Sequence, residues 1–191
     1  NLHAGHLALV ERAKQLAEIV VVSIFVNPLQ FAPHEDYANY PRSLQQDCQQ
    51  LAELGVDYVF APAREALQID SHEMQTQVSL SALSAELCGV TRPTFFQGIT
   101  TIICKLFNII QPDVVVFGKK DYQQLTIIRQ MIADLNYPIA LESIEIQRDE
   151  KGLALSSRNQ YLSIAQRKQA AFLYKMLKEI SQALLAGEKD F

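Results

Sequence analysis

Apolar positions along the chain alternate between two spacings, which predict helices and buried strands. Residues 7–18 carry apolar side chains at helical spacing, and the run 19–26 that follows is almost continuously β-branched or apolar. The alternation recurs in further expected strands and helices: strands 56–60, 113–117 and 139–146, and helices 43–54, 98–110 and 121–136. Continuous apolar strand runs are typical of parallel sheets covered on both faces. The pattern therefore predicts an α/β fold with a Rossmann-like, doubly wound parallel sheet.

The end of the chain follows a different pattern from the rest. After the loop LALSSRNQYLS, residues 164–186 have the spacing of one long helix, and no further strand is indicated. We therefore predict a Rossmann-like domain over residues 1–160 and a separate helical segment over residues 161–191.

Composition and charge narrow the class of protein. The 191 residues are 49% hydrophobic and 20% charged, as in ordinary globular domains. The formal net charge of -4 argues against a general nucleic-acid-binding protein. Apolar runs stay below the roughly 18 residues that a membrane span needs. We therefore expect no membrane partner. Cys48, Cys88 and Cys104 lack CxxC spacing, so we expect reduced thiols and a cytoplasmic location.

Polar residues gather where the predicted strands end and helices begin. His3 and His6 (HAGH) precede the first helix, whose N–H groups and dipole favour an anion, and the glycine would let a phosphate approach the backbone. Other polar groups follow strands or precede the last helix: Asn27 and Gln30, GKKD at 118–121, and SSR at 156–158. Because ligands of doubly wound sheets bind beyond the carboxyl ends of the strands, this arrangement predicts a nucleotide triphosphate site.

Each motif alone also has a structural interpretation. The histidines can cap the first helix, Lys119 and Lys120 can be solvated charges, and SSRN can form a turn. His34 and His72 lie in polar loops without a carboxylate or cysteine at ligand spacing, so we interpret both as structural and predict no protein-built metal site. The order of the motifs and their shared position after strands favour the functional interpretation.

Longer motifs make the chain resemble a known enzyme family. FVNPLQF, YPRS, RPTFFQG, FGKKDYQQL and GLALSSRN follow HAGH in this order and are similar to motifs of the pantothenate synthetases (pantoate–β-alanine ligases) of the nucleotidylyltransferase superfamily. The resemblance implies a ligase of the coenzyme A pathway. Such an enzyme condenses (R)-pantoate with β-alanine, using ATP and passing through a pantoyl-adenylate, and it releases AMP and pyrophosphate. It also implies Mg²⁺ bound mainly through ATP oxygens, and a cytoplasmic homodimer.

The resemblance implies a role for each polar group. His3 and His6 at the ATP phosphates and Lys120 at the α-phosphate are the implied catalytic residues. The further residues implied to bind ATP are Gly118, Lys119, Asp121, Gln147, Leu155, Ser156, Ser157 and Arg158. Those implied to bind pantoate or β-alanine are Gln30, Gln124 and Asn27, whose amides can donate to a hydroxyl or carboxylate. Asp47 is a possible contact to the metal.

The chain also departs from the family pattern. The family has a strand before the histidines and a C-terminal domain that covers the site. Both are missing here, so residues 161–191 would lead into a truncated C-terminal domain. Lys119 replaces a glutamate, and Thr94, Phe95 and Gln97 replace the Gly, His and Arg of RPGHFRG. Two alternatives stay open: a related nucleotidylyltransferase-superfamily enzyme with another acceptor, and a non-catalytic nucleotide-binding module.

Overall fold

The computed structural model describes residues 1–32, 34–69 and 74–188 and contains both helices and parallel strands. The helices are α1 (Ala4–Leu16), α2 (Leu44–Glu53), α3 (Cys88–Thr91), α4 (Phe95–Ile110), α5 (Tyr122–Asp134) and α6 (Ile164–Leu185). The strands are β1 (Val21–Ser23), β2 (Tyr58–Phe60), β3 (Val114–Gly118) and β4 (Ala140–Ile144). Short 3-10 segments are η1 (Pro28–Gln30), η2 (Glu65–Leu67), η3 (Leu83–Ala85), η4 (Lys119–Asp121) and η5 (Ser157–Tyr161).

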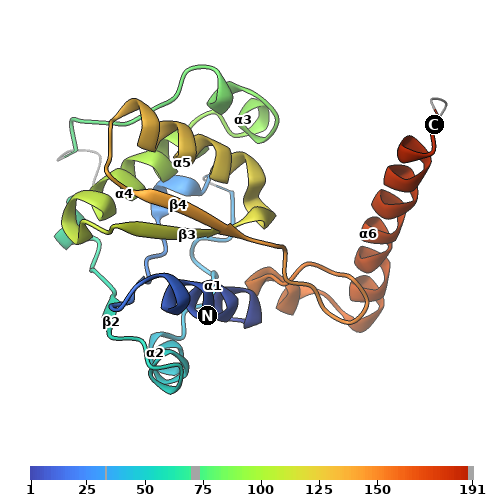
Figure 1. Ribbon diagram of the computed structural model, residues 1–191, viewed down its shortest axis with the longest axis horizontal. Coiled ribbons are helices and arrows are strands. Elements are labelled where there is room, and N and C mark those ends of the chain that lie inside the picture. Colours follow the sequence, from blue (N-terminus) through green and yellow to red (C-terminus); the bar gives the residue numbers. More distant parts are fainter. Residues whose placement is uncertain (33, 70–73, 189–191) are drawn as a thin grey trace.

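Helices cover both faces of the β3–β4 pair (Figure 1). α1 packs on one face, and α4 and α5 pack together on the other. The main core lies on this second face, where side chains of α4 and α5 meet those of the strands: Phe96, Ile99, Phe107, Ile127, Ile128, Met131 and Ile132, with Val115, Phe117 and Leu141 packed against them. Burial of each such aliphatic or aromatic side chain contributes roughly 1.5–3 kcal/mol. The spacing over 121–136 predicts five inward apolar positions, of which Leu125, Ile128, Met131 and Ile132 are buried. Leu135 is 48% exposed, because it lies at the C-cap, past the last turn of α5.

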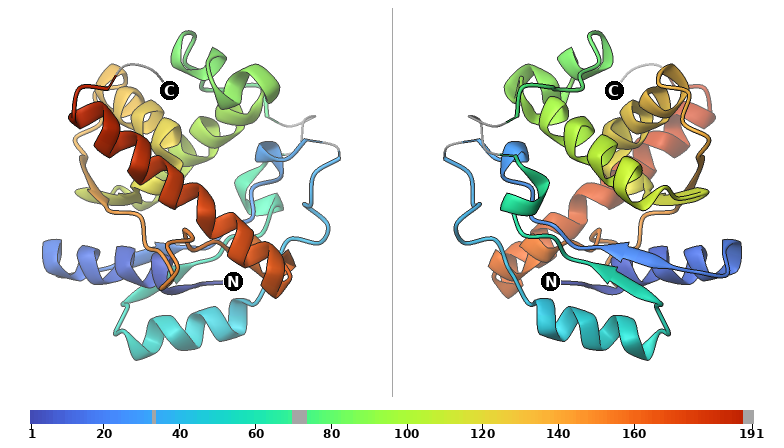
Figure 2. Two further views of the ribbon diagram at one scale, coloured as in Figure 1. Left: turned by 90° about the vertical axis from the view of Figure 1, so that its right-hand side faces the viewer. Right: turned by 90° about the vertical axis from the view of Figure 1, so that its left-hand side faces the viewer.

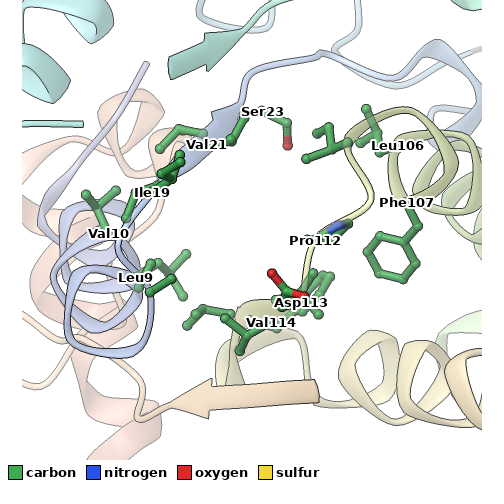
Figure 3. Close-up of a pocket in the computed structure, with 18 of the residues that line it drawn as sticks. Leu9, Val10, Ile19, Val21, Ser23, Leu106, Phe107, Pro112, Asp113 and Val114 are labelled. Atoms are coloured by element: carbon green, nitrogen blue, oxygen red, sulfur yellow. The ribbon is translucent and has the colours of Figure 1, made fainter. Parts of the chain in front are cut away.

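The described strands form two parallel pairs, β1 with β2 and β3 with β4. Figure 2 shows β1 and β2 together with α1 and α2, away from α4 and α5. A cavity of about 480 Å³ lies between β1 and β3, and its lining is mostly aliphatic (Figure 3). The labelled lining residues include Leu9, Val10, Ile19, Val21, Leu106 and Val114. β1 has only three residues, fewer than the predicted run 19–26, and it pairs over its whole length with the equally short β2.

α6 projects from the rest of the molecule (Figure 1), and Ala171 is its only buried residue. It begins at a capping box in which the Ser163 N–H donates to Gln166 Oε1 (2.8 Å) and the Gln166 N–H donates to Ser163 Oγ (3.3 Å). Tyr174, in the middle of α6, connects the helix to the preceding loop, since its ring centroid lies 3.6 Å from the Arg148 guanidinium. The helix agrees with the expected helical segment, while the domain boundary near residue 160 stays a prediction. In the part of the chain that is described, no helix combines the length and apolar character of a membrane span.

Candidate active site

His3 and His6 form a capping box at the N-terminus of α1. The Gly5 N–H donates to His3 Nδ1 (3.1 Å), and the His3 N–H donates to His6 Nδ1 (3.3 Å). The two ring centroids are 3.9 Å apart. Because each Nδ1 accepts a hydrogen bond, this geometry assigns each neutral imidazole the tautomer that carries its proton on Nε2. The histidines are therefore part of the helix start, and each has an Nε2 proton left to donate.

Burial and nearby positive charge keep both imidazoles neutral at pH 7. Burial is the main cause that lowers the pKa of His6 to about 4, and the positive charge that His3 carries once it is protonated lowers this pKa further. Burial also lowers the pKa of His3, followed by the positive charge of Lys120. Neutral imidazoles that carry an Nε2 proton are hydrogen-bond donors, which suits an anionic ligand.

Gly5 lies beneath the His3 ring. A Cβ added at Gly5 would come within 2.8 Å of His3 Cε1 and 3.7 Å of the Cβ of Gln147. The His3 imidazole thus fills the space over the glycine, so the capping geometry itself requires a residue without a side chain. The approach of a phosphate to this backbone stays a prediction. Gln147 in turn accepts a hydrogen bond at its carbonyl from the Leu155 N–H (2.9 Å), which brings both predicted ATP-side residues to the HAGH turn.

The serine loop lies against the same end of α1. Ser157 is buried, and its Oγ donates to the Asn1 carbonyl (3.1 Å) across 156 positions of sequence. Ser156 caps η5, because the Arg158 N–H donates to its Oγ (3.3 Å). The structure therefore joins the serine loop to the histidine turn.

η4 follows β3 and carries the two lysines. The Lys119 ammonium pairs with the Glu145 carboxylate. Lys120 Nζ lies 3.4 Å from Asp121 Oδ2, and its side chain is 41% exposed. At Gly118 φ is -88°, and an added Cβ would meet no atom within 4 Å. No described residue packs where a side chain at position 118 would lie, so within the part of the chain that the structure describes this space is open.

The predicted pantoate residues lie on two elements. Gln30 ends η1, and Gln124 lies in the first turn of α5. The buried Asn27 fixes η1, because the Leu29 N–H donates to its Oδ1 (3.0 Å) and its Nδ2 donates to the Gly98 carbonyl (3.1 Å). Within the described ranges, neither the Gln30 nor the Gln124 side-chain amide hydrogen-bonds another group of the protein. Contact of both amides with one ligand stays a prediction.

Arg92 and Phe95 support the backbone of η1 from the RPTFFQG motif. Arg92 Nη2 donates to the Gln30 carbonyl (2.7 Å) and to the Glu35 carboxylate (2.8 Å). The guanidinium lies 3.6 Å from the centroid of the Phe95 ring, the residue that replaces a family histidine. Thr94 is the N-cap of α4 without a side-chain cap bond. This motif therefore holds the Gln30 segment through an arginine stacked on an aromatic ring.

Asp47 is 2% exposed, and hydrogen bonds within the chain engage both of its oxygens. The Asn1 nitrogen donates to Oδ2 (2.7 Å), and the Leu2 N–H (2.8 Å) and Ser43 hydroxyl (3.1 Å) donate to Oδ1. Burial raises the pKa of this carboxyl, but these hydrogen bonds outweigh burial and the net pKa is lowered. Asp47 thus orders the residues that precede α1, and its contact with a metal stays a prediction.

The described residues offer little to hold a metal by themselves. They contain no group of three or more His, Cys, Asp or Glu side chains placed to bind one ion. His34 is exposed, whereas His72 lies outside the described residues.

Sequence reasoning missed residues that position the site. Gln123 Nε2 donates to the Leu83 (2.9 Å) and Glu86 (2.7 Å) carbonyls, and its Oε1 accepts from the Cys88 N–H (3.1 Å). Asp36, in a loop without any motif signal, accepts two hydrogen bonds from Arg158. The doubled glutamine in KDYQQ was the only signal for Gln123, and it did not distinguish a structural glutamine from a ligand-binding one.

Comparison with models of known protein families shows which family the chain belongs to. The family model for pantoate–β-alanine ligases matches residues 1–190. The chain belongs to the pantoate–β-alanine ligase family. It is 53% identical over 188 residues to the pantothenate synthetase of Chromohalobacter salexigens, covering 98% of this chain and 66% of that protein. The chain thus spans about two thirds of the length of this relative, and the resemblance seen in the sequence motifs is confirmed.

Solved structures of this ligase family share the fold. The pantothenate synthetase of Thermus thermophilus superposes with a TM-score of 0.94 at 46% identity, over 98% of this chain and 67% of that one. The pantoate–β-alanine ligase of Francisella tularensis, complexed with beta-gamma ATP and beta-alanine, superposes with a TM-score of 0.86 at 38% identity, over 93% and 67%. These neighbours confirm the predicted Rossmann-like α/β class.

Proposed function

We propose that this chain forms the ATP- and pantoate-binding part of an enzyme that condenses pantoate with β-alanine to give pantothenate, AMP and pyrophosphate. The observation that carries the proposal is the capping box of His3 and His6, which leaves two neutral Nε2–H donors at a helix N-terminus. The serine loop is bonded to Asn1, two residues before this turn, and the charge of Lys120 acts on both imidazoles. Family membership supports the identity of the substrates.

The reaction has two steps. A pantoate carboxylate oxygen attacks the α-phosphorus of ATP, the bond to the bridging oxygen breaks, and pyrophosphate leaves with its electron pair. The unprotonated amine of β-alanine then attacks the acyl carbon of the pantoyl-adenylate, and AMP leaves while the amine loses a proton.

His3 and His6 serve the first step as donors to phosphate oxygens. A neutral imidazole stabilises the negative charge that builds on the leaving pyrophosphate without having to give up its own proton. The positive end of α1 acts in the same direction. Lys120 supplies the full positive charge at the α-phosphate, while the ribose lies beside the open space at Gly118 and near Asp121.

Gln30 and Gln124 bind pantoate through their unpaired amides, and Asn27 holds η1 in place beneath them. Neutral amides suit this task because they orient a carboxylate without neutralising the nucleophile. Mg²⁺ held mainly by ATP oxygens would reduce the negative charge of the phosphates, and Asp47 would be its possible contact on the protein. A cytoplasmic homodimer is the assembly that the family resemblance implies.

The test is release of pyrophosphate from ATP with pantoate, with and without β-alanine. We expect release with pantoate alone, limited to about one equivalent per site, and continuous turnover when β-alanine is added. A related enzyme with another acceptor would release pyrophosphate only with that acceptor. A non-catalytic module would bind ATP in a calorimetric titration and ignore pantoate.

A further inference from the structure

Two consecutive carboxylates in the loop after η1 hold arginines that come from two different motifs. Glu35 accepts a hydrogen bond from Arg92 of RPTFFQG (2.8 Å). Asp36 accepts two from Arg158 of the serine loop, from Nε to Oδ2 (3.0 Å) and from Nη2 to Oδ1 (2.8 Å). The second pair is bidentate, a geometry that fixes the plane of the guanidinium as well as its position. It joins segments 122 positions apart.

The same loop surrounds the Arg158 side chain with aromatic rings. Its guanidinium lies 5.2 Å from the centroid of the Tyr40 ring and 5.7 Å from that of Phe31. The Tyr161 hydroxyl, three residues after the arginine, donates to the Asn39 carbonyl (3.2 Å). A side chain that is already held by a carboxylate, by aromatic rings and by a hydrogen bond of a neighbouring residue loses little further conformational entropy when it binds a ligand.

Arg158 keeps one edge of its guanidinium for another partner. Asp36 engages Nε and Nη2, and within the described residues Nη1 donates no hydrogen bond to a protein group. The Arg158 side chain is 49% exposed. An arginine bound to a carboxylate along one edge can still bind an anion through its remaining N–H groups.

The loop also connects Arg158 to the backbone of Gln30. Arg92 bonds the Gln30 carbonyl (2.7 Å) and Glu35 with the same nitrogen. Glu35 is tied to its own loop, because the Ala32 N–H donates to its carboxylate (3.0 Å). Arg92 therefore links the Gln30 backbone to Glu35, and Glu35 is joined through the peptide chain to Asp36, which bonds Arg158.

We propose that Asp36 is a positioning residue that presents Arg158 to the nucleotide phosphates, and that this contact couples ATP binding to the loop that carries Gln30. The proposal rests on the proposed function, because it takes the ligands of the two loops to be ATP and pantoate. Binding of ATP or pantoate then orders the contacts between the two loops before the other ligand binds. Each ligand therefore raises the affinity for the other, and by linkage by the same factor.

The direction in which ATP affinity changes when the Asp36 carboxylate is removed distinguishes positioning of Arg158 from competition between Asp36 and phosphate for Arg158. If Asp36 merely held Arg158 away from phosphate, removal of the carboxylate charge would strengthen ATP binding. If Asp36 positions the arginine, the same removal weakens ATP binding and also reduces the influence of pantoate on it.

The experiment compares Asp36→Asn and Asp36→Glu with the matched variant Glu142→Gln. Glu142 also pairs with an arginine between two elements (Arg12, 3.1 Å), but away from both loops. ATP dissociation constants are measured by calorimetry with and without saturating pantoate, and thermal unfolding serves as a control for folding. We expect the unchanged chain to bind ATP several-fold more tightly when pantoate is present.

In Asp36→Asn we expect ATP to bind about 3- to 10-fold more weakly, and pantoate to change its affinity by less than about twofold. Asp36→Glu should restore part of the coupling. Glu142→Gln should keep both the ATP affinity and the effect of pantoate on it. The melting temperature should be unchanged in all three variants. Tighter ATP binding in Asp36→Asn, unchanged coupling, or an equal loss in Glu142→Gln would overturn the proposal.

Failure of the proposed function looks different. If the unchanged chain binds ATP but ignores pantoate, the ligand assigned to the Gln30 loop is wrong, and the coupling is wrong with it. The effect of Asp36→Asn on ATP affinity alone still decides whether Asp36 positions Arg158. Arg158→Lys provides a second check, because adding Asp36→Asn to it should cause little further loss of ATP affinity.

Discussion

The HAGH and GKKD turns each contain a glycine among basic residues, yet the fold builds them differently. In the first turn a Cβ on Gly5 would strike the His3 ring at 2.8 Å, and both histidines make cap hydrogen bonds. In the second turn a Cβ on Gly118 would meet nothing within 4 Å, and Lys120 is 41% exposed. The packing of the chain explains the first turn in detail but leaves the second largely unexplained.

This difference separates the structural roles of the residues in these two turns from their proposed functional roles. The capping box stabilises α1 through Nδ1 of each histidine and leaves each Nε2 proton available to donate, so a structural role of the histidines does not exclude a catalytic one. Neither packing against the described residues nor the backbone conformation requires a glycine at position 118, and the proposed function places the ribose of ATP in the open space beside it. The following predictions separate these roles.

His6→Ala should cause the largest loss. Under the proposed function the change removes an Nε2–H donor to the phosphates, and we expect pantoate-dependent pyrophosphate release to fall by about 10²-fold or more. Loss of the cap bond should cost only about 1 kcal/mol of folding stability, measured by thermal unfolding. Near-normal release from a folded variant would leave His6 with the capping role alone.

The two lysines of η4 should differ in their effect on pyrophosphate release by nearly as much as His6→Ala lowers it. Lys119 is paired with Glu145, whereas Lys120 acts electrostatically on both histidines. Lys120→Ala should lower pyrophosphate release by about 10²-fold, and Lys119→Ala by no more than a few-fold. Both variants have the same charge and similar exposure, so each controls for the other. Equal losses would mean that the site uses general positive charge.

Replacement of Gln30 or Gln124 by alanine should weaken pantoate binding and spare ATP. Each loss leaves a polar group of the ligand unpaired, at about 1–3 kcal/mol, which corresponds to roughly 5- to 150-fold in affinity. Calorimetric titrations with each substrate measure the two effects separately. Gln123→Ala is the neighbouring control, and it should lower stability through loss of its bonds to the 83–88 segment. A parallel drop in ATP affinity would show that the pantoate pocket is misassigned.

The two glycines give the smallest but most selective effects. Gly118→Ala should leave the melting temperature unchanged and weaken ATP binding by a few-fold, about 1 kcal/mol, if the ribose occupies the open space. Gly5→Ala should instead lower stability by about 1 kcal/mol, because the His3 ring must move and its cap bond weakens. A destabilised Gly118→Ala variant with normal ATP binding would reverse the comparison of the two turns.

The sequence predicted the elements better than their pairing. The helix expected at 121–136 is Tyr122–Asp134, because its apolar spacing matches the face that enters the core. The apolar run 19–26 yields only Val21–Ser23 as strand, since strand length depends on a partner that no local pattern specifies.

The site could be predicted only where a motif existed. HAGH and SSRN are local signals, and the structure joins them through Ser157 and the Asn1 carbonyl. Asp36 carried no such signal, because its bond to Arg158 depends on two loops that only the tertiary fold brings together. Local spacing likewise gave no sign that His3 would fill the space over Gly5.

The protonation state of His6 tests the central claim most directly. Nitrogen-15 NMR of the labelled imidazole reports which ring nitrogen carries the proton. Because burial lowers the pKa of His6 to about 4, we expect a neutral ring at pH 7, with a proton on Nε2 and none on Nδ1, and a signal from Nε2 that shifts when ATP is added. Protonation should begin only as the pH falls toward 4. A doubly protonated ring at pH 7, or a neutral ring with its proton on Nδ1, would contradict the account.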